Sequence, residues 1–379
     1  MNSFGRLFRL SMFGESHGES VGMNLDGCPA GLSLTLEDFL PDLERRKGGI
    51  QKGTTPRKED DIPFFKSGLF NNKTTGAPLT ILFENNNTRS GDYEKQRAVP
   101  RPGHADFVAH KKFGGFEDFR GGGHFSARLT VALVAAGVIA KKLLAGVGQE
   151  LSTVEAGPPS AGIGRESAES DLSGAEGSDA LRLSGMPDWE KNAGIQVRAS
   201  ILEIGGERDV EAGLQKAIDA KDTIGGIVEC RVSGLPVGLG EPFFDSVESL
   251  LSHAVFAIPA IRGVEFGTGF AAAQLFGSQH NDAIETMEGR TRTNHAGGVV
   301  GGITNGNELV LRVAVKPTSS TPKEQQTLNW VTGEVEPFSV KGRHDLCIAL
   351  RVPVVLEAVT AIVLADLLLL EQHIKRIIP

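Results

Sequence analysis

Two stretches of the sequence are apolar on nearly every side, the pattern of helices buried in a protein core. The first extends from Ser126 to Leu144 and the second from Leu356 to Leu370. The apolar run around the second, residues 352–370, also contains a proline and two acidic residues, which would be costly in hydrocarbon. We therefore predict two buried helices and no membrane span.

Shorter apolar runs predict strands. Residues 4–13 and 21–25 should form a hairpin whose polar tip is Gly14–Gly18. A helix is expected from Thr35 to Lys47, with a kink at Pro41. The other predicted elements are a helix at 247–256 and strands at 224–232, 263–266, 308–315 and 327–332. This order is that of a mixed α and β protein, and no repeat of about 20 to 50 residues indicates a solenoid or propeller.

Four segments lack such patterns and are interpreted as loops. Residues 50–60 and 84–106 are rich in Gly, Pro, Asn, Arg and Lys, which indicates ordered loops near a binding site. Residues 151–185 are rich in Ser, Gly, Ala and Glu, which predicts a variable surface excursion. Residues 282–298 contain arginines and hinge glycines, and we predict that they close over a bound ligand.

The charge of the chain limits its partners. Its 39 Lys and Arg residues against 47 Asp and Glu give a net charge of -8, which argues against bulk binding to nucleic acid or to an anionic membrane. An anionic ligand must therefore be bound by local basic clusters. Both predicted buried helices follow loops that contain Gly, His and Arg, at 120–128 and 342–351. Backbone N–H groups and cations are thus expected together at two helix starts.

The cysteines and glycines add two expectations. Cys28, Cys230 and Cys347 are too few and too far apart for a disulfide framework or a CxxC metal site, which favours a reducing cytoplasm and no bound metal. Residues 1–13 contain no apolar run typical of a signal peptide. Glycine is frequent, at 48 of 379 residues, which indicates many turns or close approaches of the backbone to ligands.

The predicted hairpin tip, Gly14–Gly18, matches the G-x-S-x-G pattern of a hydrolase nucleophile elbow. That elbow requires a strand, a sharp turn and then a helix. Here a second strand is predicted to follow, and few residues precede the motif. A serine hydrolase is therefore the weaker alternative, and a plain polar hairpin tip is another.

A second glycine motif, residues 267–272, fits the G-x-G-x-x-A fingerprint of dinucleotide-binding folds. No long helix clearly follows it, because Gly277 interrupts the candidate. We prefer a glycine turn between a strand and a loop, and keep the Rossmann-type site as a weak alternative.

Three further segments combine groups suited to anion binding and proton transfer. Arg101–Asp106 places His104 in a rigid Pro-Gly turn beside a cation and a carboxylate that could tune it. Gly342–Asp345 puts a cation, an imidazole and a carboxylate in succession before the second helix. Lys316–Ser320 offers one cation and three hydroxyls, which suit a phosphate. Taken singly, each could equally be a surface turn, a structural salt bridge or a solvated loop.

Taken together and in order, these motifs resemble the chorismate synthase family over nearly the whole chain. Only the region 151–185 lacks its character. The blocks that carry the resemblance are Phe13–Gly18, Asp26–Gly31, Asp42–Arg46, Arg101–Asp106, Phe119–Gly123, Gly238–Pro242, Asn294–Gly298, Lys316–Ser320 and Gly342–Asp345.

The resemblance implies one α/β domain over residues 1–379, a β-α-β sandwich with the two buried helices at its centre, assembled as a cytoplasmic homotetramer. The family performs a 1,4-anti elimination of phosphate from 5-enolpyruvylshikimate 3-phosphate, giving chorismate in the shikimate pathway to aromatic amino acids. It uses reduced FMN without net redox change. The reductant of the FMN is either NADPH, used by the protein itself, or an external donor.

The resemblance also implies roles for particular residues. His17 is the acid near the leaving phosphate, His104 protonates or stabilises the reduced flavin, and Asp345 works with flavin N5 to accept the hydrogen as a proton. Ser16 and Ser126 orient these groups. The implied substrate-binding cations are Arg46, Lys52, Arg101, Arg128 and Arg343. The implied FMN contacts are His124, Phe125, Ser126, Pro259, Ala260, Gly301, Lys316, Pro317, Thr318, Ser319, Ser320 and Arg343. The implied NADP contacts are Arg46 and Lys52.

The sequence departs from the commoner family pattern at three places. His124-Phe125 stands where Arg-Ser is frequent, which bears on their side-chain contacts with FMN. Leu129 stands where Glu is frequent. Lys52 stands where Arg is frequent, and Lys cannot replace the arginine fork at a nicotinamide site. A flavin- or phosphate-binding protein without catalytic activity is the alternative function, which the presence of His17, His104 and Asp345 argues against.

Overall fold

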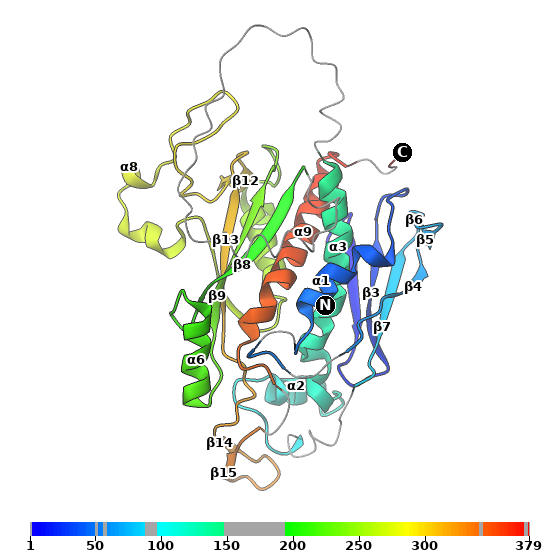
Figure 1. The fold of residues 1–379 in the computed structure, drawn as a ribbon, viewed down its shortest axis with the longest axis vertical. Coiled ribbons are helices and arrows are strands. Elements are labelled where there is room, and N and C mark those ends of the chain that lie inside the picture. The colour runs from blue at the N-terminus through cyan, green and yellow to red at the C-terminus, as the bar shows by residue number, and fades with distance from the viewer. Residues whose placement is uncertain are drawn as a thin grey trace.

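A computed structural model describes residues 2–49, 52–55, 59–87, 97–147, 194–340, 344–374 and 378. In it a pair of long helices separates two antiparallel sheets, so the fold has three layers (Figure 1). The predicted β-α-β sandwich is confirmed. The excursion predicted at 151–185 lies outside the described residues.

The first sheet comes from the N-terminal part of the chain and has the order β1-β2-β3-β7-β4. Its strands are β1 (Ser3–Phe4), β2 (Arg9–Gly14), β3 (Ser20–Asp26), β7 (Leu79–Glu84) and β4 (Phe64–Ser67). Alternate residues of its central strands are buried, for example Val21, Met23 and Leu25 of β3. This alternation turns one face of the sheet toward the helices, as a period of two requires.

The hairpin predicted at the start of the chain is confirmed, since Arg9 pairs with Asp26 and Gly14 with Val21. A strand follows the G-x-S-x-G motif, and the nucleophile elbow is therefore excluded. The predicted strand 4–13 is wrong in one respect, because it breaks between β1 and β2. There the buried carboxylate of Asp366 accepts hydrogen bonds from three successive backbone N–H groups, those of residues 6–8. That tertiary contact has no signature in local periodicity.

The second sheet has the order β10-β13-β9-β8, again antiparallel throughout. Its strands are β10 (Ile261–Phe266), β13 (Leu309–Val315), β9 (Gly226–Ser233) and β8 (Gln196–Ile204). The strands predicted at 224–232, 263–266 and 308–315 are thus confirmed within two residues. The G-x-G-x-x-A segment follows the antiparallel strand β10 and continues into a short 3-10 helix, η7 (Gly269–Gln274). It therefore lacks the βαβ context of a Rossmann site.

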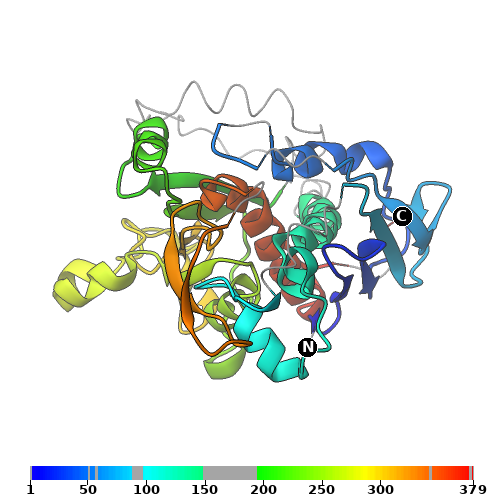
Figure 2. The same ribbon diagram turned by 90° about the horizontal axis from the view of Figure 1, so that it is seen from below.

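The helix layer consists mainly of α3 (Thr130–Gly146) and α9 (Val352–Leu370), which lie side by side between the sheets (Figures 1 and 2). A Cβ atom on Gly137 would lie 2.2 Å from Cβ of Ala358, so the glycine allows the two helices to approach closely. Both helices are long and apolar enough to span a membrane by composition, but 89% and 94% of their apolar windows are buried inside the fold. They are core helices, as predicted.

The remaining helices and strands lie around these layers. The region predicted as one kinked helix at 35–47 is a 3-10 turn followed by α1, and Pro41 lies in the first turn of α1, where proline is tolerated. The remaining helices and strands, in chain order, are η1 (Leu36–Asp38), α1 (Leu40–Arg46), β5 (Leu69–Phe70), β6 (Lys73–Thr74), α2 (Asp106–Phe113), η3 (Arg120–Phe125), η4 (Ala127–Leu129), α6 (Val210–Ala220), η6 (Phe243–Asp245), α7 (Val247–Val255), α8 (Gly277–His280), β11 (Val299–Val300), β12 (Ile303–Thr304), β14 (Gln325–Leu328), β15 (Val335–Phe338) and η8 (Ile348–Arg351).

Candidate functional site

A cavity of about 940 Å³ lies where both core helices begin. Thr130 of α3 and Arg351, which precedes α9, both line it. The two helix starts, where N–H groups and cations were expected, therefore border the same cavity. One part of the wall is apolar and includes Leu10, Met12 and Ile362. The rest carries the imidazoles, cations and carboxylates described below, a composition typical of ligand cavities.

A run of three glycines in η3 brings two of the predicted histidines against one loop. Residues 121–123 have φ angles of 62°, 80° and 51°, a region that favours glycine. A Cβ atom on Gly121 would lie 2.5 Å from Cδ2 of His17, and one on Gly122 would lie 3.1 Å from Cε1 of His104. A side chain at either position would therefore strain the backbone and press on the adjacent imidazole. Both imidazoles line the cavity.

His104 belongs to a charged cluster within the 101–106 turn. Its Nδ1 is 2.6 Å from Oδ1 of Asp106, and that carboxylate also accepts hydrogen bonds from Nε and Nη2 of Arg101. Burial lowers the pKa of His104 below its ordinary value, and the nearby Arg101 charge adds to this effect although Asp106 opposes it. A neutral imidazole at this distance donates from Nδ1 to the carboxylate, which leaves Nε2 as an acceptor.

Asp345 is held at both carboxylate oxygens. Oδ1 accepts a hydrogen bond from the backbone N–H of Thr55 at 2.8 Å, and Oδ2 accepts one from Nη1 of Arg351 at 3.0 Å. The side chain is buried and lines the cavity. Asp345 thus shares the cavity with His17 and His104.

The two predicted serines lie in different positions relative to the cavity. Ser126 lines it, and its Oγ accepts a hydrogen bond from the N–H of Arg128 at 3.2 Å, which caps η4. Ser16 is fully buried behind the wall, and its N–H donates to the carbonyl of Gly123 at 3.1 Å. Ser16 is therefore placed to support its neighbour His17 from behind.

Three of the five predicted substrate-binding cations line the cavity. Arg46, Arg101 and Arg128 are buried there, each with a carboxylate partner. Lys52 is exposed and does not line the cavity. Arg343 lies outside the described residues.

Most of the predicted flavin contacts also share this cavity. Lys316, in the loop after β13, donates from Nζ to the carbonyl of Gly103 at 3.0 Å, which joins the 316–320 loop to the His104 turn. Burial and the charge of Arg262 lower the pKa of Lys316. The cavity-lining members of this set are His124, Phe125, Ser126, Pro259, Ala260, Lys316, Pro317, Thr318, Ser319 and Ser320. Gly301 lies in the exposed turn between β11 and β12 and does not line the cavity of this chain.

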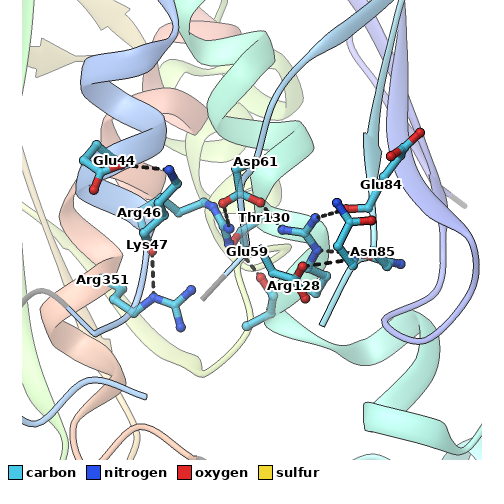
Figure 3. A network of polar contacts seen from close by, with 12 residues as sticks. Glu44, Arg46, Lys47, Glu59, Asp61, Glu84, Asn85, Arg128, Thr130 and Arg351 are labelled. Carbon is cyan, nitrogen blue, oxygen red and sulfur yellow. Dashed lines mark hydrogen bonds and ion pairs between the residues drawn. The ribbon is translucent and has the colours of Figure 1, made fainter. Parts of the chain in front are cut away.

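Sequence reasoning missed several residues of this cavity. Glu59 lies in the loop 50–60, which had been interpreted only as lying near a site, and Asp61 directly follows that loop. Arg351 lies in the turn before α9. The run of acidic residues at 59–61 resembles a solvated charge cluster. Of these three residues only Asp61 is buried, where it contacts Arg46 and Arg128, which are distant in the sequence (Figure 3).

Comparison with known proteins identifies the chain. The family model described as chorismate synthase matches residues 8–369. A chorismate synthase of Chitinophaga pinensis is 65% identical over 377 residues, which cover 100% of this chain and 99% of that protein. One from Dehalococcoides mccartyi strain BAV1 is 44% identical over 379 residues, with the same coverage of both chains.

A crystal structure of chorismate synthase has the same fold, with a TM-score of 0.64 and 24% sequence identity, over 97% of this chain and 93% of that one. The family match and the two relatives confirm the resemblance inferred from the ordered motifs, and with it the prediction that the protein is an enzyme of the lyase class. The match over nearly the whole chain shows that this protein belongs to the chorismate synthase family.

Proposed function

We propose that the protein catalyses the 1,4-anti elimination of phosphate from 5-enolpyruvylshikimate 3-phosphate to give chorismate, with reduced FMN as cofactor. The observation that supports this most is the grouping of His17, His104 and Asp345 around a cavity that also contains buried arginines. Two imidazoles and a carboxylate suit a reaction in which phosphate leaves and a proton is removed. The arginines suit a substrate with two carboxylates and a phosphate.

The residues around the cavity fit a flavin mononucleotide. The apolar wall of Leu10, Met12 and Ile362 suits an aromatic ring system, and the 316–320 loop offers an ammonium and hydroxyl groups to a phosphate. Oγ1 of Thr318 is buried without a hydrogen-bond partner among the described residues, as expected of a group that meets a ligand. When bound, reduced FMN would supply electron density to the substrate as the phosphate departs and recover it afterwards.

The protein's own groups would manage the protons. His17, close to the glycine run of η3, would donate to the leaving phosphate. His104, neutral and oriented by Asp106, would present Nε2 to the reduced flavin. Asp345, fixed at both oxygens, would accept the hydrogen at C6 as a proton. The cavity walls would keep bulk water from these steps.

The proposed setting is the cytoplasm, with the chain assembled as a homotetramer. Several large apolar side chains are strongly exposed in the single chain, including Phe243 (87%), Phe244 (92%) and Met287 (98%). Exposed apolar groups of this size favour contacts with another subunit. Light scattering coupled to size exclusion measures the mass of the assembly directly, and a monomer would contradict this part of the proposal.

The test of the activity is an anaerobic assay of phosphate release and chorismate formation with the substrate, FMN and dithionite. Product should form only with reduced flavin. Equal turnover without flavin would overturn the proposed mechanism, and flavin binding without turnover would support the inactive-protein alternative. Replacing dithionite with NADPH tests whether the protein reduces its own cofactor. Of the two residues implied as NADP contacts, Arg46 lines the cavity and Lys52 does not.

A further inference from the structure

We propose that Asp61 is a positioning residue, which holds the guanidinium groups of Arg46 and Arg128 together so that both bind the same anionic part of the substrate. The identity of that substrate rests on the proposed function. The arrangement itself does not, because it is a property of the cavity wall. All three residues line the cavity.

The carboxylate of Asp61 lies between the two arginines (Figure 3). Oδ2 accepts a hydrogen bond from Nη2 of Arg46, and Oδ1 accepts one from Nη1 of Arg128. The side chain of Asp61 is 0% exposed, and those of the two arginines are each 3% exposed. One buried carboxylate therefore fixes one donor group of each guanidinium.

Other contacts hold the two guanidinium groups in place around Asp61. Nε of Arg128 donates to Oδ1 of Asn85 at 2.9 Å, and its Nη2 donates to the carbonyl of Glu84 at 3.1 Å (Figure 3). Nη1 of Arg46 lies 3.5 Å from Oγ1 of Thr130. The donors are thus oriented before a ligand arrives, which reduces the entropy lost on binding.

The charges of the cluster favour an anionic ligand. Two buried guanidinium groups face one buried carboxylate, so Asp61 offsets one of the two positive charges. Burial and the charge of Arg46 lower the pKa of Arg128, against the effects of Asp61 and, more weakly, of Glu59, which also lines the cavity. Without Asp61 the two cations would repel each other in a poorly solvated site. With it they can meet the same anion.

The backbone conformation at Asp61 also supports a functional role for this residue. Its φ angle is 51°, in the left-handed region that residues other than glycine seldom adopt. Such strain persists where the surrounding structure requires it, and it clusters at functional sites. Here it occurs three residues before β4, at the position where the chain passes the two arginines.

A second buried carboxylate provides a matched control. Asp42 accepts hydrogen bonds from Nη1 of Arg45 and from Nζ of Lys141, both at 2.8 Å, and is 5% exposed. It therefore also joins two cations, but it does not line the cavity. Replacing either carboxylate with the amide removes one buried charge from between two cations. Only Asp61→Asn should disturb the ligand site.

The experiment measures kcat and KM for the substrate in wild type, Asp61→Asn and Asp42→Asn, together with the binding of inorganic phosphate to each flavin-free protein by calorimetry. Loss of the charged hydrogen bonds should raise KM about tenfold to a hundredfold in Asp61→Asn and weaken phosphate binding in parallel. In Asp42→Asn both quantities should stay within twofold of wild type. Thermal stability should fall in both variants.

Equal changes in KM for the two variants, or no change in Asp61→Asn, would overturn the proposal, because Asp61 would then be an ordinary structural ion pair. If Asp61→Asn does not fold, Asp61→Glu serves instead. It keeps the charge but misplaces both arginines, so KM should rise at least about threefold, and an unchanged KM overturns the proposal. A wild type that binds phosphate but forms no chorismate would refute the proposed function alone.

Discussion

Arg351 donates a hydrogen bond from Nη1 to Oδ2 of Asp345 at 3.0 Å, and the same guanidinium donates from Nε to the backbone carbonyl of Arg46 at 2.8 Å. One side chain thus joins the start of α9 to the end of α1 at the edge of the cavity (Figure 3). The carboxylate that we propose as the proton acceptor is thereby tied to the same helix end that carries a proposed substrate-binding arginine.

Replacing Arg351 with Gln should lower kcat about tenfold to a hundredfold, with a smaller effect on KM, because the orientation of Asp345 is lost. Steady-state kinetics under anaerobic conditions measures both constants. The matched control is Arg312→Gln, since Arg312 also joins a carboxylate, that of Glu229, to a backbone carbonyl, that of Gly267, but away from the cavity. Equal losses of kcat in the two variants would contradict a role for Arg351 in orienting Asp345.

Gly121→Ala should reduce activity through His17. The added methyl group would lie 2.5 Å from Cδ2 of His17 and 2.8 Å from Oγ of Ser16, at a φ angle of 62°. Gly206 has a φ angle of 83° and no heavy atom within 4 Å of an added Cβ, so Gly206→Ala introduces backbone strain without a clash. Both variants should lose about 1–2 kcal/mol of stability from strain.

Only Gly121→Ala should also lower kcat, by about a hundredfold or more, which is the usual effect of losing a general acid. The direct variant His17→Ala should show a loss of the same size. Steady-state rates and thermal unfolding of the three variants together test this prediction. A Gly121→Ala protein with wild-type kcat would show that His17 can move away without consequence, and would remove the main structural argument for its catalytic role.

How far the sequence could predict this site depends on the range of the contacts involved. The core helices α3 and α9 and the first hairpin have local periodicity, so they could be predicted. The motifs around His17 and His104 could be recognised separately, but their common contact with one glycine loop depends on tertiary packing. Asp61 could not be identified, because nothing near it in the sequence distinguishes a buried carboxylate from a solvated one.

The loop at 282–298 shows a second limit of prediction from the sequence. Its glycines and arginines predicted a lid, but none of its residues lines the cavity of this chain. The carboxylate of Asp282 accepts hydrogen bonds from the N–H groups of His295 and Ala296, and Ile284 pairs with Thr291. All of these contacts join residues within the loop. These bonds join residues close in the sequence, yet composition alone does not show which polar groups pair. Hydrogen exchange with and without ligands still tests closure.

The pKa of His104 should fall further when Asp106 is replaced with Asn. Asp106 favours the charged imidazole, and its removal also leaves the Arg101 charge without its partner, so both effects act in the same direction. The C2–H resonance of His104, followed by NMR as the pH is lowered, measures this pKa. The same resonance in wild type, followed over the same pH range, gives the reference. A higher pKa in the variant would contradict the assignment.

The same pKa shift affects stability. Because the pKa of His104 in the folded state lies below its ordinary value of 6.5, the unfolded chain binds more protons in the interval between the two pKa values. The contribution of His104 to stability is therefore complete above pH 6.5 and is lost as the pH falls through the folded-state pKa. The stability of His104→Gln relative to wild type should improve as the pH is lowered from about 7 to 5. Urea unfolding at several pH values measures the difference, and a constant difference would refute it.

Glu357 should matter greatly for stability and little for catalysis. This α9 residue is 1% exposed, and its carboxylate accepts hydrogen bonds from both terminal nitrogens of Arg45, from Nζ of Lys141 and from the N–H of Ala199. It thus joins α1, α3 and β8 to α9 within the helix layer. Glu357→Gln removes the negative charge but leaves the buried Lys141 and the partly exposed Arg45, which should cost about 3–5 kcal/mol of the free energy of unfolding.

The control is Glu207→Gln, which breaks the exposed ion pair with Lys216 and should cost less than about 1 kcal/mol. Glu357 does not line the cavity, so kcat and KM of the folded Glu357→Gln protein should equal those of wild type at a temperature well below its unfolding. Urea unfolding and steady-state kinetics on the same preparations separate the two effects. A loss of stability no larger than that of Glu207→Gln would show that Lys141 and Arg45 find other partners or water, and that the fold tolerates them without this carboxylate.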